Sequence, residues 1–165
     1  MIEEKAGWFV VNVKDAGWYE GADFGKVCGF ELHGRFPETG VYLYILEPGK
    51  PNCRYHRENV QEDFLVLSGE CLLLANGEER RLGAWDYVHC PAGVTHVFVG
   101  AGDGPCVILM IGHRPPPDKL QLFYPRSELA RGYGAEAPEP TADPKVAYSD
   151  VARKTEIDAP EWPLE

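Results

Sequence analysis

The sequence predicts an all-β barrel or sandwich followed by a proline-rich extension. Residues 8–113 consist of short β-rich runs separated by Gly, Pro and Asn, and no stretch keeps an apolar period of 3.6 residues for three turns. All 5 Cys and all 5 His lie in residues 1–113, whereas 9 of the 14 Pro lie in residues 114–165. The chain therefore divides into two regions of different composition.

The first region is expected to hold ten short strands, a number typical of a closed barrel or a two-sheet sandwich. In chain order the predicted strands are Trp8–Val13, Lys26–Leu32, Val41–Leu46, Cys53–Glu58, Glu62–Leu67, Glu70–Ala75, Glu78–Leu82, Trp85–Cys90, Val94–Val99 and Pro105–Ile111.

Two tight turns connect these strands. Asn76-Gly77 predicts a two-residue hairpin turn between Glu70–Ala75 and Glu78–Leu82, because both residues tolerate a positive φ. A second reversal is expected at Ser68-Gly69. Such turns favour an antiparallel arrangement.

Alternation assigns side chains to faces without saying which face points inward. Glu62, Phe64 and Val66 share one side of their strand, and Tyr42 and Tyr44 share one side of theirs. Both sides of each strand are partly apolar, so either could face the core.

The barrel domain is predicted to span residues 1–113 and the C-terminal extension residues 114–165. The prolines at 115–117 end the last strand, because proline has no N–H for the sheet. One short helix is expected at Ser127–Arg131, with Ser127 as its N-cap and Gly132 and Gly134 as its end; the rest of the extension reads as extended chain.

The extension is too apolar for a free linker. Its aromatic residues are Tyr124, Tyr133, Tyr148 and Trp162. We therefore expect it to pack on the barrel or on a partner subunit, and we expect the protein to be a homodimer.

Charge and cysteine content exclude several classes of protein. The net charge of −10 disfavours nucleic acid and anionic membranes as partners. No apolar run approaches the roughly 20 residues needed to span a bilayer, and the N-terminal MIEEKAGW has no signal-type stretch, so a cytoplasmic protein is expected. The five cysteines form no CxxC pair and are expected to be reduced and mostly buried.

Four side chains suited to metal binding are expected to converge. His56 and Glu58 are two residues apart on one side of a strand, and Glu62 opens the next strand. In a barrel, His96, which follows the Pro91–Gly93 turn, would lie opposite them. Imidazole and carboxylate ligands suit Fe(II), Mn(II), Ni(II) or Zn(II).

These residues resemble the cupin superfamily, whose first motif is G-x5-H-x-H-x(3,4)-E-x6-G. His56 matches the first histidine, Glu58 stands where the second belongs, and Glu62 and Gly69 match the glutamate and the final glycine. Gly49 precedes His56 by one residue more than the motif asks.

The second cupin motif is G-x5-P-x-G-x2-H-x3-N. Pro91, Gly93 and His96 match it at the proper spacing, whereas Trp85 replaces the leading glycine and Gly100 the final asparagine. The resemblance implies a double-stranded β-helix, or jelly-roll barrel. It also implies a divalent metal site at His56, Glu58, Glu62 and His96. This site would have two histidines and two glutamates, whereas the family site has three histidines and one glutamate.

The resemblance leaves the function open between two classes. One is a small-molecule enzyme, a metal-dependent dioxygenase or isomerase; the other is a non-catalytic binding or sensing protein whose His/Glu cluster only anchors a small molecule. If the metal site has been lost, His56 and His96 would be hydrogen-bonded barrel residues. The expected pocket walls are Tyr42, Tyr44, Phe64, Phe98 and Met110.

Two neighbouring residues are assigned structural roles. Arg54 shares the side of the strand that carries His56 and Glu58, and we expect it to neutralise Glu58, with binding of an anionic substrate as the alternative. His89 is expected to be a half-buried sheet residue.

Overall fold

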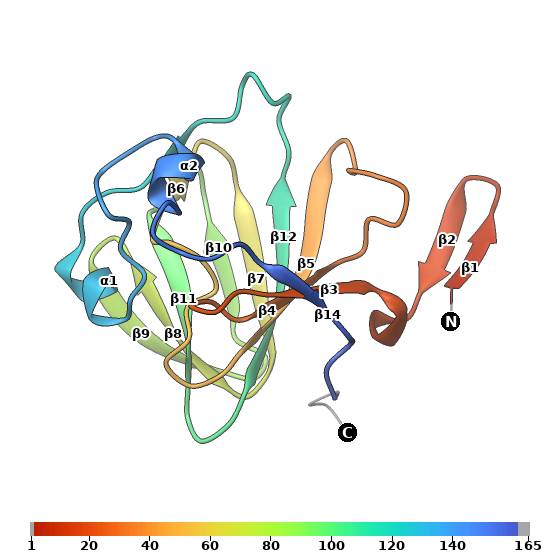
Figure 1. The fold of residues 1–165 in the computed structure, drawn as a ribbon, viewed down its shortest axis with the longest axis horizontal. Helices are drawn as coiled ribbons and strands as arrows, with labels where there is room; N and C mark the ends of the chain where they lie inside the picture. Colours follow the sequence, from red (N-terminus) through yellow and green to blue (C-terminus); the bar gives the residue numbers. More distant parts are fainter. Residues whose placement is uncertain (1, 162–165) are drawn as a thin grey trace.

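The computed structural model describes residues 2–161 and shows two antiparallel sheets packed face to face (Figure 1). The larger sheet has the strand order β10-β7-β12-β5-β4-β3-β14, and the smaller has the order β11-β8-β9. Two further pairs, β1-β2 and β13-β6, lie outside these sheets. The all-β jelly-roll prediction is confirmed.

The strands are β1 (Ile2–Lys5), β2 (Trp8–Val11), β3 (Gly17–Glu20), β4 (Lys26–Gly29), β5 (Thr39–Leu46), β6 (Arg57–Glu58), β7 (Glu62–Ser68), β8 (Glu70–Ala75), β9 (Glu78–Gly83), β10 (Tyr87–Cys90), β11 (His96–Ala101), β12 (Cys106–His113), β13 (Leu122–Phe123) and β14 (Thr155–Ile157). The helices are a 3-10 turn η1 (Val13–Asp15), α1 (Glu128–Gly132) and α2 (Pro144–Ala147).

The main core lies between the two sheets and resolves the alternation that the sequence left open. Along β7, the buried residues are Glu62, Phe64 and Val66, and their partners across the ladder on β12 are Gly112, Met110 and Ile108. Tyr42 and Tyr44 occupy the matching positions on β5. The tyrosine side of β5 and the Glu62 side of β7 thus face the barrel interior.

Both predicted turns are found. Asn76 and Gly77 have φ values of 48° and 86° and join β8 to β9, whose ends pair at Ala75 and Glu78. Gly69 has φ of 71° and carries the chain from the larger sheet to the smaller one. Trp85 has φ of 73°, so the residue that replaces the motif glycine keeps a backbone conformation that glycine favours.

The short helix is also found, with the Ser127 hydroxyl accepting a hydrogen bond from the Ala130 N–H at 3.1 Å. The extended reading of the remaining tail was wrong at Pro144–Ala147, where Asp143 caps α2 and proline occupies the first turn. The tail also contributes the strands β13 and β14.

Several strand predictions need correction. β1 and β3 were missed, and of the predicted strand Cys53–Glu58 only β6 is regular. The reason is that the backbone of this segment bonds to different partners in turn: the Asn52 N–H donates to Phe98 O and the Tyr55 N–H donates to Ala135 O. Such changing partners leave the chain extended without forming a ladder.

The C-terminal residues wrap around the barrel (Figure 1). Ala130 and Ala135 pack on Leu74 and Val97 of the smaller sheet, and β14 extends the larger sheet at β3. Trp162, one of the expected aromatic contacts, lies outside the described residues.

Arg54 ties the barrel to this extension. Its guanidinium donates to the backbone oxygens of Gly134 and Glu136 at 3.0 and 2.7 Å and pairs with Asp150 at 2.6 Å. The expectation that Arg54 neutralises Glu58 was therefore wrong, because its side chain is buried against the extension instead.

The burial of the cysteines agrees with the prediction for four of the five residues. Cys28, Cys71, Cys90 and Cys106 are free and buried, as expected, while Cys53 is half-buried beside His56. Among residues 2–161, none of the helices has the length and apolar character needed to cross a membrane.

Candidate functional site

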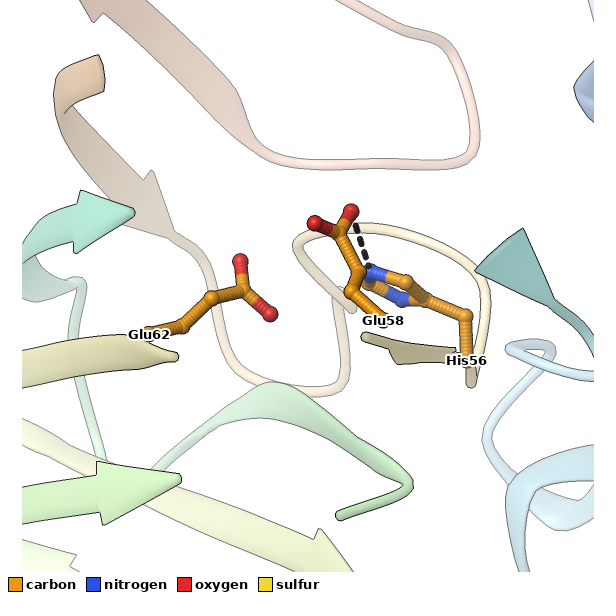
Figure 2. Close-up of side chains that lie close together, drawn as sticks. All are labelled: His56, Glu58 and Glu62. Carbon is orange, nitrogen blue, oxygen red and sulfur yellow. Dashed lines mark ion pairs between the residues drawn. The ribbon is translucent and has the colours of Figure 1, made fainter. Parts of the chain in front are cut away.

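Three of the four predicted ligands come together at one end of the barrel. His56 and Glu58 lie at β6, Glu62 opens β7, and their ligand atoms lie within 4.8 Å of one another. Figure 2 shows the Glu62 carboxylate pointing toward the other two side chains. His56 Nε2 lies 3.6 Å from Glu58 Oε1.

The fourth predicted ligand, His96, adjoins this group without belonging to the tight set of three. Its backbone pairs with that of His56 in an isolated antiparallel bridge, and the two ring centroids are 5.4 Å apart. Its Nε2 lies 3.3 Å from Glu62 Oε2, and the residue is only 2% exposed. Glu62 therefore lies between the two halves of the cluster.

Hydrogen bonds set the orientation of both imidazole rings. Nδ1 of His56 lies 2.8 Å from Arg54 O, and Nδ1 of His96 lies 3.1 Å from Val94 O. Because a carbonyl oxygen can only accept, each Nδ1 carries the proton and each Nε2 of a neutral ring presents its lone pair to a glutamate. Lone pairs facing carboxylates require a proton or a metal cation between them.

The pKa values in the cluster follow from these contacts. Burial alone lowers the pKa of His56, but the neighbouring Cys53, Glu58 and Glu62 outweigh it and hold this pKa well above the ordinary 6.5. Burial raises the pKa of Glu62, but the hydrogen bond to His96 and the charges of both histidines bring it below the ordinary 4.5.

These shifts have opposite consequences for stability. The contribution of His56 is complete below pH 6.5 and is lost as the pH rises through its raised pKa. The contribution of Glu62 is present above pH 4.5 and is lost as the pH falls through its lowered pKa. A metal ion would compete with the proton for His56 Nε2.

A cavity of about 160 Å³ opens onto the two carboxylates. Gly112 lies directly opposite Glu62 on β12 and so adds no side chain beside that carboxylate. Gly40, opposite Gly112 on β5, leaves its space to the Arg114 guanidinium and the Tyr42 ring. Arg114, Tyr42 and Met110 also line the cavity and form its wall in front of the two carboxylates.

The extension covers the other side of the cluster. Tyr124 is buried and stacks on the His56 ring with centroids 5.6 Å apart, and Tyr148 meets Tyr124 edge to face at 6.0 Å. β13 pairs with β6, and Leu122 lies opposite Glu58 in that pair. Residues from the tail therefore complete the environment of His56 and Glu58.

Of the expected pocket walls, Tyr42 and Met110 line the cavity, whereas Phe64 and Phe98 are buried in the core beneath it. Tyr44 packs against the same core. His89 is exposed rather than half-buried, because it lies on the outer side of the edge strand β10, where its Nδ1 contacts Asp63 at 2.7 Å. It takes no part in the cluster.

Two residues at the site were missed. Tyr124 contacts His56 although the two residues are far apart in the sequence, and no local pattern predicts this contact. Its aromatic side chain indicated only that the extension packs on another surface. Arg35 lines the cavity from the loop before β5, and no motif or spacing signals it.

The comparison with protein families bears on these observations. The family model described as the cupin domain matches residues 42–112, which run from β5 to the end of β12 and include all four predicted ligands. Residues 42–112 of this chain are a cupin domain.

Solved structures show the same fold around this cupin domain. A sugar phosphate isomerase of the cupin superfamily from Silicibacter pomeroyi is 24% identical over 70% of this chain and 80% of its own, with a TM-score of 0.62. An uncharacterized conserved protein with a double-stranded β-helix domain from Klebsiella pneumoniae is 18% identical over 68% and 95% of the two chains, with a TM-score of 0.56.

A third solved structure matches over a smaller part of both chains. It is a protein from Acidithiobacillus ferrooxidans named as a candidate sugar phosphate isomerase, 29% identical over 52% of this chain, with a TM-score of 0.48. This chain spans about half of that protein, 55% of its length. No curated protein matches the chain.

The chemistry of the donor set fits a divalent cation. One imidazole and two carboxylates, from His56, Glu58 and Glu62, lie within 4.8 Å of one another, and His96 Nε2 adjoins Glu62 at 3.3 Å. The carbonyls of Arg54 and Val94 contact Nδ1 of the two rings, which is the usual outer contact of metal-binding histidines. The two carboxylates add negative charge that a cation would offset.

Proposed function

We propose that this cupin binds a divalent metal ion through His56, Glu62 and His96, with Glu58 as a fourth ligand or as a proton carrier, and that it is a small-molecule enzyme. The observation that carries the proposal is the fixed direction of both Nε2 atoms toward glutamates at the mouth of a cavity. Because hydrogen bonds already orient both imidazole rings, less side-chain ordering is needed when an ion binds.

The residues around the cavity suit isomerase or oxidoreductase chemistry. A bound metal ion would polarise a carbonyl or enediol, or activate O2. Two carboxylates among four ligands favour an oxygen-preferring ion, so Fe(II) and Mn(II) are preferred here over Ni(II) and Zn(II). Glu58 lines the cavity and has a half-buried carboxylate, so it is the group placed to take a proton from a substrate and return it.

The chemistry of the site residues favours one reaction type, a proton transfer between adjacent carbons. A carboxylate base beside a polarised carbonyl is the arrangement needed to move a proton between adjacent carbons, which is the step of an aldose–ketose isomerisation. One structural relative is named as a sugar phosphate isomerase, which is a reason to include such substrates in a screen.

The alternative is a non-catalytic small-molecule binding or sensing protein. One observation supports this alternative. Tyr124 and Tyr148 cover the side of His56 away from the cavity, so the space left for a ligand is small. In that case the His/Glu cluster anchors a ligand without changing it.

A turnover screen separates the two functions. The purified protein would be stripped with a chelator, loaded separately with Fe(II), Mn(II), Ni(II) or Zn(II), and incubated with pooled sugars, sugar phosphates, keto acids and aromatic diols under air. We expect metal-dependent conversion by the wild-type protein and none by the Glu58→Gln variant. Tight binding of a small molecule that is recovered unchanged in every pool would favour the alternative.

We also propose that the protein is a cytoplasmic homodimer. Large apolar side chains are exposed on the β1-β2 hairpin, at Trp8 and Val10, and at or just before the edge strand β10 of the larger sheet, at Tyr87 and Trp85. An isolated two-stranded hairpin is only marginally stable, which supports its packing on a second copy. Light scattering should give twice the mass of the 18.4 kDa chain; a monomer at every concentration would contradict the proposal.

A further inference from the structure

The loop that carries Arg35 is held firmly against the mouth of the barrel. Arg114, just after β12, pairs with both carboxylate oxygens of Glu31 and donates to the hydroxyl of Tyr42. Glu31 in turn accepts the backbone N–H of Phe36, next to Arg35. The backbone on either side of Arg35 is therefore anchored to β5 and β12.

Gly40 makes this anchoring possible. A Cβ atom at this position would lie 2.8 Å from the Arg114 guanidinium and 2.9 Å from the Tyr42 ring. Because glycine leaves that space open, Arg114 lies across β5 and reaches Glu31. The Arg114 guanidinium is thus bound to Glu31 and Tyr42 within the protein.

Arg35 differs from Arg114 in having no such partner. Among residues 2–161 it forms no hydrogen bond or ion pair, and its charge acts on Glu31, which Arg114 already holds. Its side chain is exposed and lines the same 160 Å³ cavity as Glu58 and Glu62. The cavity therefore has carboxylates at one wall and an unpaired guanidinium at another.

We propose that Arg35 binds the anionic group of the substrate, a phosphate or a carboxylate, while the oxygen-bearing end of the same molecule meets the His56, Glu62 and His96 cluster. The inference deepens the proposed function and rests on it for the position of the reacting end. A divalent ion offsets the two carboxylates, so the charge of Arg35 remains for the ligand. A guanidinium presents two parallel donors to an oxyanion, which fixes the orientation of the bound molecule.

The cavity indicates the kind of substrate. Arg35 and the carboxylates of Glu58 and Glu62 line the same small cavity of about 160 Å³. This arrangement suits a short molecule with a hydroxyl or carbonyl at one end and an oxyanion at the other.

The test uses two probes that each carry one oxyanion, glycerol 3-phosphate and 3-hydroxypropanoate, titrated calorimetrically into the protein with and without Mn(II). We expect Arg35→Gln to weaken at least one probe about tenfold, because a charge-assisted contact is lost, and Arg35→Lys to recover part of that affinity. The probe with the larger loss identifies the phosphate or carboxylate class. Arg80→Gln is the matched control, because Arg80 is exposed on β9 and loses the same charge away from the cavity.

Mn(II) affinity is measured for each variant in the same series. It should be unchanged by Arg35→Gln, since Arg35 is not among the proposed ligands. If wild-type protein binds neither probe, or if Arg35→Gln binds both as tightly as wild type, the inference is overturned. If Mn(II) does not bind while Arg35-dependent binding of a probe persists, the proposed metal function fails and the anion site stands.

Discussion

Replacing His96 with Ala is expected to lower the affinity for Mn(II) or Fe(II) more than about 100-fold. The loss of a residue that only contacts a metal ligand lowers metal affinity about 10- to 100-fold, and the loss of a ligand itself should lower it further. His96 is buried, its Nδ1 is bound to Val94 O, and its Nε2 lies 3.3 Å from Glu62. Removing the ring takes away one proposed ligand and also the group that orients Glu62. Calorimetric titration of chelator-treated protein with each metal measures the loss.

The matched control is His89→Ala, which removes an imidazole from the outer side of β10, where it contacts Asp63. It should leave metal affinity unchanged. Because His96→Ala leaves a hole in a buried site, Glu62→Gln provides a second variant of nearly equal volume, and it should also weaken metal binding strongly. Wild-type affinity in both His96→Ala and Glu62→Gln would show that the metal is held elsewhere.

Gly100→Ala is expected to destabilise the protein by about 3 kcal/mol or more, which is the upper range for overpacking. A Cβ at Gly100 would lie 2.2 Å from Glu47 O and 2.7 Å from Leu46 O, and these are backbone atoms that cannot rotate away. Gly100 also bonds to the turn that follows β5, since its N–H donates to Lys50 O and its carbonyl accepts from the Gly49 N–H. β11 and this turn therefore cannot move apart without losing hydrogen bonds.

Gly83→Ala is the control for this substitution. Gly83 also lies in a strand, at the end of β9, and an added Cβ there meets nothing within 4 Å. We expect its effect to stay within about 1 kcal/mol. Urea unfolding measures the free energy of unfolding of both variants. Equal values would mean that the backbone at Leu46 and Glu47 moves away from the added Cβ at little cost.

Features with a local cause were predicted well from the sequence. Asn76-Gly77 forms the hairpin turn because both residues accept a positive φ, and Ser127 caps α1 because its hydroxyl reaches Ala130. The convergence of His56, Glu58 and Glu62 follows from a two-residue spacing and a short turn.

Features caused by distant parts of the chain were not predicted. The guanidinium of Arg54 contacts Asp150, 96 residues away, so its neighbours could not be read from its own strand. Arg35 reaches the cavity because Arg114 anchors its loop, and Tyr124 reaches His56 because β13 pairs with β6. Short pieces such as β3 and β14 form because a neighbouring strand offers an edge, which no propensity reveals.

The pairing of β6 with β13 also sets an order of events during synthesis. A chain is made from its N-terminus, so the barrel strands up to β12 exist before Leu122 and Phe123, which give β6 its strand partner, and before Tyr124, which covers His56. Residues that follow the barrel strands in the chain thus finish the wall around the His/Glu cluster. Until then His56 stays open on that side, and an incomplete chain that stopped at residue 113 would carry the cluster without this wall.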